Sequence, residues 1–155
     1  MSLYLALKTI HILSSTLIFG TGLGSVYYLW SAHPARDLPA LRLTTRAVVL
    51  ADWLFTTPAI VIQPVTGAWL MLALGYRFDS AWFAWVVGLY LVAGACWIPV
   101  VVIQYRLRAF AACASSWDAL PTGYRRLMRW WVALGVGAFA AVLGLFALMV
   151  LRPGL

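Results

Sequence analysis

The chain has 155 residues, of which 65% are hydrophobic and 10% are charged. A soluble globular domain is about half apolar and about a quarter charged, so this composition excludes a water-soluble protein and indicates an integral membrane protein. The net charge of +7 comes from 11 Lys and Arg residues against 4 Asp and Glu residues. Because the basic residues lie at the ends of apolar segments, they favour anchoring at a lipid surface over nucleic-acid binding.

Four apolar segments follow one another along the chain, and each is long enough to cross a membrane. A helix rising about 1.5 Å per residue needs about 20 apolar residues to cross a hydrocarbon core of about 30 Å. The first segment is much longer than a signal-peptide core, so we expect it to be retained. The sequence therefore predicts an all-α protein, a single membrane domain forming an up-down-up-down four-helix bundle, with spans at about 3–31, 47–74, 81–105 and 128–151.

Arginines gather in two of the three links between these segments. Proline also marks the first of these links. Pro34 predicts the end of the first helix, because proline cannot continue it, and Pro39 suits the first turn of the second helix. The positive-inside rule places both basic links in the cytoplasm and both termini outside. The arginines of these links are Arg36, Arg42, Arg46, Arg106, Arg108, Arg125, Arg126 and Arg129.

Ionisable and polar side chains inside the spans are the candidate functional residues, since such groups are costly in a membrane unless something binds them. At about 100° per residue, the first span carries a polar stripe that includes Lys8 and His11, and one face of the second includes Asp52 and Gln63. The third span adds Tyr90. Counting residues from the helix ends places His11, Gln63 and Tyr90 at a similar depth, in the outer third of the membrane.

Asp52 and Gln104 lie near the inner edge by the same count. Two interpretations of this pair remain open. Asp52 is either a structural ion-pair partner of Arg46, Arg108 or Arg129, or a proton relay or substrate-binding acid.

His11 carries the sharpest hypothesis, that the protein binds haem b through this side chain. A neutral imidazole in a helix bundle is a common axial ligand of haem iron. Lys8, one turn nearer the outer surface, would pair with a haem propionate, while Gln63 and Tyr90 would line the site. His33 lies at the far end of the first span, so the iron would need another ligand, a partner chain or an open position.

A structural interpretation of His11 stands beside the haem hypothesis. In it, the histidine makes an interhelical hydrogen bond to Gln63 or Tyr90, and Lys8 extends its ammonium group outwards to water. The corresponding alternative functions are a transport or binding module for a small solute or a proton, and an accessory subunit of a larger membrane complex. In each case lipid is one partner, and so small a bundle favours a homo-oligomer or a partner membrane subunit.

The whole chain resembles a bacterial family of predicted integral membrane proteins known as domain of unknown function 2269. The likeness lies in residues 7–13, 51–55, 62–67 and 94–99, and it implies four spans in a bacterial cytoplasmic membrane. The first span has Ile10-His11-Ile12 near its start, Gly22-Leu23 in its middle, and Tyr27-Tyr28 and a histidine near its end. In these residues it resembles the first helix of the HemJ-type protoporphyrinogen oxidases, which bind haem b. That likeness implies that His11 takes the position of the haem-binding histidine. Since the second and third spans lack lysine and histidine within the membrane, it implies haem binding more than oxidase activity.

Overall fold

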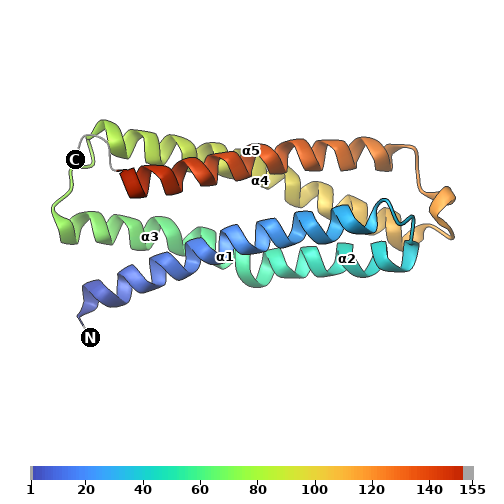
Figure 1. Cartoon of the computed structure of the whole chain (residues 1–155), viewed down its shortest axis with the longest axis horizontal. Coiled ribbons are helices and arrows are strands. Elements are labelled where there is room, and N and C mark those ends of the chain that lie inside the picture. The colour runs from blue at the N-terminus through green and yellow to red at the C-terminus, as the bar shows by residue number, and fades with distance from the viewer. Residues whose placement is uncertain (1, 152–155) are drawn as a thin grey trace.

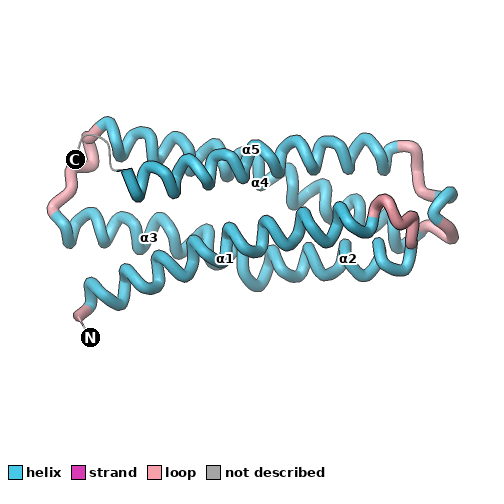
Figure 2. The backbone as a smooth tube through the Cα atoms, viewed as in Figure 1, coloured by secondary structure: helices cyan, strands magenta, loops and turns pink. Residues whose placement is uncertain are grey.

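The computed structural model describes residues 2–151. Within this range the secondary structure consists of helices joined by loops, with no strands (Figures 1 and 2). Two short segments interrupt or link the α-helices, a π-helical one (η1) and a 3-10 one (η2). In chain order the elements are α1 (Leu3–Ala32), α2 (Leu38–Ala51), η1 (Asp52–Thr56), α3 (Thr57–Leu74), α4 (Ala81–Cys113), η2 (Trp117–Ala119) and α5 (Gly123–Leu151).

The predicted four-helix, up-down-up-down membrane bundle is confirmed. α2, η1 and α3 form one continuous rod, so residues 3–151 contain four helices long and apolar enough to cross a membrane. In Figure 1 the start of α1 and the end of α5 lie at the same end of the bundle as the 75–80 loop. We call the half of the bundle near them the terminal half, and the half near links 33–37 and 114–122 the basic half.

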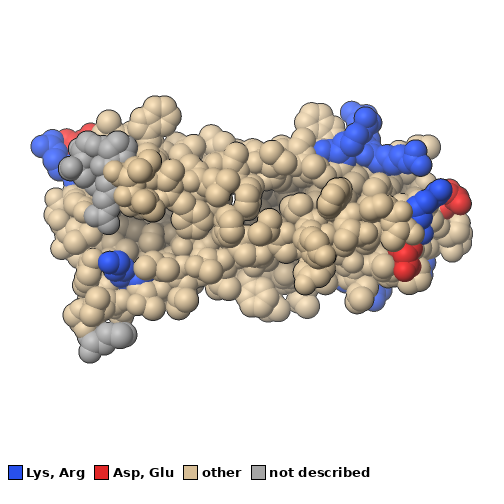
Figure 3. All heavy atoms as spheres, viewed as in Figure 1, with Lys and Arg blue, Asp and Glu red and all other residues tan. Residues whose placement is uncertain are grey.

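The surface of the bundle matches a lipid environment. Large apolar side chains are exposed along every helix, including Leu91 on α4 at 64% and Val136 on α5 at 64%. On the face drawn in Figure 3, charged side chains lie towards the two ends, and more of them lie in the basic half. Such an arrangement suits a rod whose middle contacts hydrocarbon and whose ends contact lipid headgroups and water.

The rod formed by α2, η1 and α3, hereafter the second rod, changes from α-helix to π-helix at η1, shortly before Pro58. A proline inside a helix lacks an N–H donor, and its ring collides with the carbonyl four residues earlier. Here that carbonyl belongs to Leu54, inside the π-helical turn. A wider turn accommodates the proline without ending the helix, and such turns often occur at functional sites.

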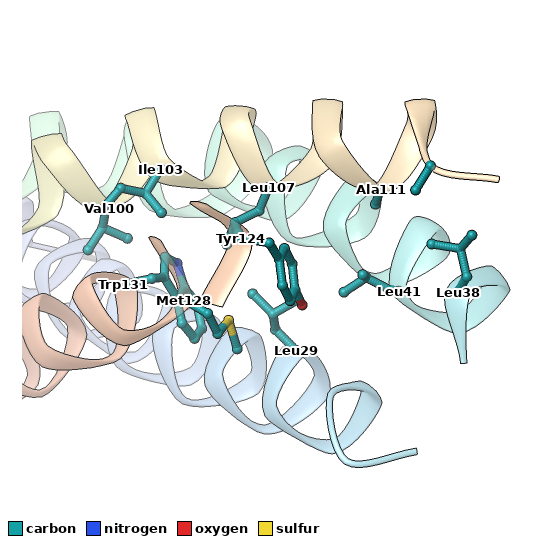
Figure 4. Packing of buried hydrophobic residues seen from close by; sticks show 11 residues of the cluster. Leu29, Leu38, Leu41, Val100, Ile103, Leu107, Ala111, Tyr124, Met128 and Trp131 are labelled. Carbon is teal, nitrogen blue, oxygen red and sulfur yellow. The ribbon is translucent and has the colours of Figure 1, made fainter. Parts of the chain in front are cut away.

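The apolar core lies in the basic half (Figure 4). Its members come from α1, α2, α4 and α5, and Leu29, Leu41 and Leu107 are the largest that are completely enclosed. Arg42 adds hydrogen bonds beside this core, because its guanidinium donates to the carbonyls of Ala111 (2.8 Å) and Ala114 (2.6 Å). The arginine of one rod thereby satisfies carbonyl groups that the end of α4 leaves free.

Aromatic and charged residues of the two basic-half links hold each other at the bundle's end. His33 stacks on Tyr124 with ring centroids 5.6 Å apart, and Trp117 contacts both rings edge-on. Arg36 forms an ion pair with Asp118 across the same links. Burial, with the positive charge of Arg125, lowers the pKa of His33 below its ordinary value of 6.5.

Candidate functional site

His11 lies in the terminal half, where α1 packs against α3. Its ring nitrogen Nδ1 is 2.8 Å from the hydroxyl oxygen of Thr66. The ring also lies against Gly67, since a Cβ atom there would be 3.4 Å from Cε1 of His11. A glycine at this position lets the imidazole approach the backbone of α3.

The Thr66 hydroxyl determines which nitrogen of His11 carries the proton. This hydroxyl lies 2.7 Å from the carbonyl oxygen of Ile62 and 3.2 Å from that of Gln63, so its single proton is donated to its own helix. It therefore accepts the hydrogen bond from His11, whose Nδ1 is the protonated nitrogen. The ring also hydrogen-bonds to the backbone of Gln63, and in a neutral ring protonated at Nδ1 the lone pair lies on Nε2.

Gln63 fixes the backbone beneath this ring. Its Nε2 group donates to the carbonyl oxygen of His11 (2.8 Å) and to the hydroxyl of Ser14 (2.9 Å), which is 3% exposed. The Gln63 side chain thus holds α1 through the backbone of His11 rather than through its ring. The ring contact expected to Gln63 is made to its backbone, the ring also bonds to Thr66, and the Tyr90 hydroxyl bonds to Ile60 instead of to the ring.

The other predicted site residues lie at different distances from this centre. The Tyr90 hydroxyl donates to the carbonyl oxygen of Ile60 at 2.6 Å, which ties α4 to α3 one turn before Gln63. Lys8 is exposed, and its ammonium lies 5.8 Å from the centre of the Tyr4 ring. The structure therefore joins Gln63 directly to His11 and leaves Lys8 and Tyr90 as neighbours without a hydrogen bond to it.

Asp52 belongs to a second location, at η1. Its side chain is buried, and Oδ1 accepts a hydrogen bond from Thr56 at 2.9 Å. The ion-pair interpretation of Asp52 is wrong, because the ion pairs among the described residues are Arg36–Asp118 and Arg77–Asp79. The side chain of Gln104 hydrogen-bonds to Asp52, and Oδ2 of Asp52 and Oε1 of Gln104 are buried without a further partner among residues 2–151.

The two locations share one helix face without being joined by polar contacts. Between them on the second rod lies Ala59, an apolar residue that is 1% exposed. No hydrogen bond within residues 2–151 links the His11 group to the Asp52 group. A continuous polar path through the bundle therefore receives no support from the contacts, and the two locations are best treated as separate sites.

Sequence reasoning missed the hydrogen bonds of Thr66 and Ser14, which position His11 and Gln63. A signal for Thr66 was present, because it follows Gln63 by three residues and Ala59 by seven and so lies on the same helical face. Ser14 follows His11 by three residues in the same way. Hydroxyl side chains are common in spans and usually bond to their own helix, so their polarity alone did not single them out.

Among residues 2–151 no group of three His, Cys, Asp or Glu side chains lies close enough to hold a metal ion. Comparison with curated proteins and with solved structures finds no match to this chain. One family model does match, that of the predicted integral membrane proteins of domain of unknown function 2269, and it covers residues 5–153. The chain belongs to this family of membrane proteins.

Proposed function

We propose that the protein binds haem b through Nε2 of His11 and has a redox role in the membrane. The observation that carries the proposal is the hydrogen bond between His11 and Thr66, together with the Thr66 contacts to its own helix. Histidines that ligate a metal almost always donate their other ring N–H to a fixed acceptor, which sets the tautomer and the ring orientation. His11 has such an acceptor in Thr66, and with the proton on Nδ1 the lone pair of Nε2 is the one that would bind iron.

The absence of a ligand cluster around His11 within residues 2–151 favours a macrocycle over a simple metal ion. Structural zinc takes four protein ligands, and catalytic zinc takes three. A porphyrin supplies four nitrogens of its own, so one histidine is enough to hold the iron from one side. The donor set of this site therefore fits haem better than it fits zinc.

Each neighbour of His11 has a role in this proposal. Thr66 orients the imidazole, Gly67 makes room for it, and Gln63 holds the backbone of His11 in place. Lys8 lies one turn nearer the terminal end and is exposed, so its ammonium is available to a propionate. His33, about 33 Å further along α1, is too far away to ligate the same iron.

A haem bound here supplies one-electron transfer. The proposal includes a bacterial cytoplasmic membrane as its location and a second copy of the chain, or a partner membrane subunit, as a neighbour. Any further protein ligand to the iron would come from that neighbour. A porphyrin or a quinone is the substrate class proposed for an electron-transferring site of this kind.

The test is an absorption spectrum of the detergent-purified protein, oxidised and reduced, from cells supplied with haem. We expect a Soret band that sharpens on reduction, is lost in His11→Gly and returns when imidazole is added to that variant. His33→Ala is the matched control and should keep the band. Thr66→Val should weaken haem affinity by about 10- to 100-fold, the usual effect of removing the acceptor behind a ligating histidine.

A folded wild-type protein without a Soret band would contradict the proposal. So would a band of equal strength in His11→Gly before imidazole is added. In the first case, co-purification of another membrane protein would support the accessory-subunit alternative, and flux of a solute or protons into liposomes would support the transport alternative.

A further inference from the structure

A groove of about 620 Å³ lies between α4 and α5 in the basic half of the bundle and is open to the surface. Its lining residues include Arg106, Ala109 and Phe110 from α4, and Arg126, Leu127 and Trp130 from α5. On the face drawn in Figure 3, basic side chains gather over the start of α5. Because His11 lies in the terminal half, what this groove binds is independent of the haem proposal.

The wall of the groove is apolar and its rim is charged. Phe110, Leu127 and Trp130 belong to the wall, and Trp130 is 54% exposed. Arg106 and Arg126 are both exposed, and since almost all of the wall is apolar, they border it with their carbon stems. Long basic side chains at a membrane surface keep their charged heads towards water, so the two guanidinium groups lie at the rim.

The two arginines at the rim have no acidic partner within residues 2–151. Of the four acidic residues, two form ion pairs with other arginines, Asp37 caps the start of α2 and Asp52 is buried at η1. The side chains of Arg106 and Arg126 make no hydrogen bond in this range either. Two neighbouring guanidinium groups without an anion favour a ligand that carries negative charge.

The groove lies where lipid headgroups meet hydrocarbon. α4 has 33 residues, a length of about 50 Å, and therefore exceeds a hydrocarbon core of about 30 Å by roughly 10 Å at each end. Arg126 follows the start of α5 by three residues and Arg106 precedes the end of α4 by seven, so both lie within about 10 Å of the bundle end. Trp130 lies one turn further from that end than Arg126, at the depth of an interfacial tryptophan.

The wall and the rim together decide the class of ligand. A free phosphate matches the rim and leaves the apolar wall uncovered. A second copy of the chain does not match the rim, because its acidic residues are engaged in the same way. A phospholipid supplies both a phosphate and a hydrocarbon chain, and the groove is within the range of about 300–1,000 Å³ that is usual for ligand sites. A zwitterionic headgroup would add its own cation beside two arginines, so a lipid with a net negative charge fits better.

We propose that this groove binds one anionic phospholipid. The phosphate lies between Arg106 and Arg126, since guanidinium groups bind phosphate oxygens through paired N–H donors. One acyl chain follows the apolar wall past Leu127 and Trp130 towards the hydrocarbon. Basic pockets between the cytoplasmic ends of spans bind anionic headgroups in this way. The bound lipid thereby joins α4 to α5 beside the 114–122 link.

The experiment measures lipid binding to the purified full-length protein by native mass spectrometry and by the shift of its unfolding temperature in a neutral detergent. The probes are phosphatidylglycerol and phosphatidylcholine with identical oleoyl chains, and glycerol phosphate, which has no chains. We expect saturable binding of phosphatidylglycerol, at least about tenfold tighter than that of phosphatidylcholine, because only the first has a net charge. Glycerol phosphate that binds as tightly as phosphatidylglycerol would assign the site to a soluble phosphate compound and overturn the proposal.

Two charge-matched variants separate this site from a general attraction between a basic protein and an anionic lipid. Arg106→Gln combined with Arg126→Gln should weaken phosphatidylglycerol binding about 25-fold, roughly fivefold for each arginine at an anionic lipid surface. Arg46→Gln combined with Arg108→Gln removes the same charge from exposed arginines of the basic half that do not line the groove. This control should leave the preference for phosphatidylglycerol over phosphatidylcholine unchanged.

The apolar wall is tested without a change of charge. Ala109→Phe places a ring in the groove from an exposed position and should weaken phosphatidylglycerol binding several-fold, because the acyl chain loses its contact with the wall. Leu91→Phe, at a lipid-facing position of the same helix, should leave it unchanged. Equal binding of the two phospholipids to the wild type, an equal loss in the two arginine variants, or full binding in Ala109→Phe would overturn the proposal. The comparison of phospholipids uses the wild type, so it decides the matter even if a variant fails to fold.

Discussion

The two halves of the bundle are held together by different interactions. In the basic half, α2 lies between α1 and α4, and their side chains join those of α5 in one apolar core. In the terminal half, α1 packs mainly against α3, and α4 mainly against α5. Contact between the two pairs there includes Phe19, whose ring centroid lies 5.0 Å from that of Phe139.

In the terminal half, hydrogen bonds between helices take the place of the shared apolar core of the basic half. The bonds from His11 to Thr66 and from Gln63 to Ser14 join α1 to α3, and the indole of Trp82 donates to the carbonyl oxygen of Leu148 at 2.9 Å to join α4 to α5. A lipid-soluble helix gains little from burying apolar area, so packing and hydrogen bonds must specify its neighbours. A shared apolar core therefore holds the basic half, and hydrogen bonds between helices hold the terminal half.

The largest expected effect comes from the core of the basic half. Leu107→Ala removes a side chain that is 0% exposed and should lower the free energy of unfolding by about 2 kcal/mol, the lower end of the range for such substitutions, because hydrocarbon replaces water in the reference state. Unfolding in sodium dodecyl sulfate, followed by circular dichroism, measures it. Leu91→Ala on the lipid-facing side of the same helix is the control and should change little.

The second largest loss of stability should come from removing the Arg42 hydrogen bonds in the basic half. Arg42→Gln removes the charged hydrogen bonds to the carbonyls of Ala111 and Ala114. Hydrogen bonds to charged groups contribute about 1.5–3 kcal/mol, and a glutamine can replace part of one, so we expect a loss of about 1.5 kcal/mol. The same detergent titration applies, and Arg46→Gln, at an exposed arginine, should have a much smaller effect.

In the terminal half, Gln63→Leu tests whether polar contacts hold α1 to α3. The change removes the bonds to the His11 carbonyl and to Ser14, and hydrogen bonds between spans contribute about 0.6 kcal/mol on average, so the loss should be about 1 kcal/mol. Hydrogen exchange should rise in residues 3–14 and stay unchanged at the basic-half end of α1. Equal exchange along α1 would show that the two halves do not differ in this way.

The sequence allowed the fold to be predicted because hydrophobic length and loop charge determine the number of spans and their alternation. It also singled out the rod face shared by Asp52, Ala59 and Gln63, since helical periodicity places such residues together. It was harder to predict which side chains contact each other across neighbouring helices. The His11 ring does contact Gln63, but at its backbone, while the Gln63 amide bonds to the His11 carbonyl and the ring nitrogen to Thr66.

Contacts between spans depend on how far each helix is rotated about its axis and how deep it lies in the membrane. The composition of a span determines neither. A shift of one residue along α1 would place Ser15 instead of Ser14 opposite Gln63, and both are serines. The π-helical turn before Pro58 adds a second uncertainty, because an extra residue in one turn rotates everything after it relative to everything before it. Asp52 lies buried in that turn, so its surroundings could not be derived from periodicity.

A smaller effect should appear with pH at the basic-half links. The pKa of His33 is lower in the folded protein than its ordinary value of 6.5, so the unfolded state binds more protons. Stability linked to His33 is therefore complete above about pH 6.5 and is lost as the pH falls towards the folded pKa. His33→Gln should flatten the difference in unfolding temperature between pH 7.5 and pH 5.5, and an unchanged pH dependence in this variant would exclude His33 as its source.

The smallest effect should come from the 75–80 loop of the terminal half. The Arg77 guanidinium hydrogen-bonds to Asp79 and lowers the pKa of that carboxyl, yet both side chains are highly exposed, at 80% and 66%. Water and salt screen such pairs, and ordering two surface side chains offsets most of the attraction. Asp79→Asn should therefore leave the unfolding temperature unchanged at low and high salt. A clear, salt-dependent loss would mean that this loop holds α3 and α4 together, and that the terminal half relies on charge as well as on hydrogen bonds within the membrane.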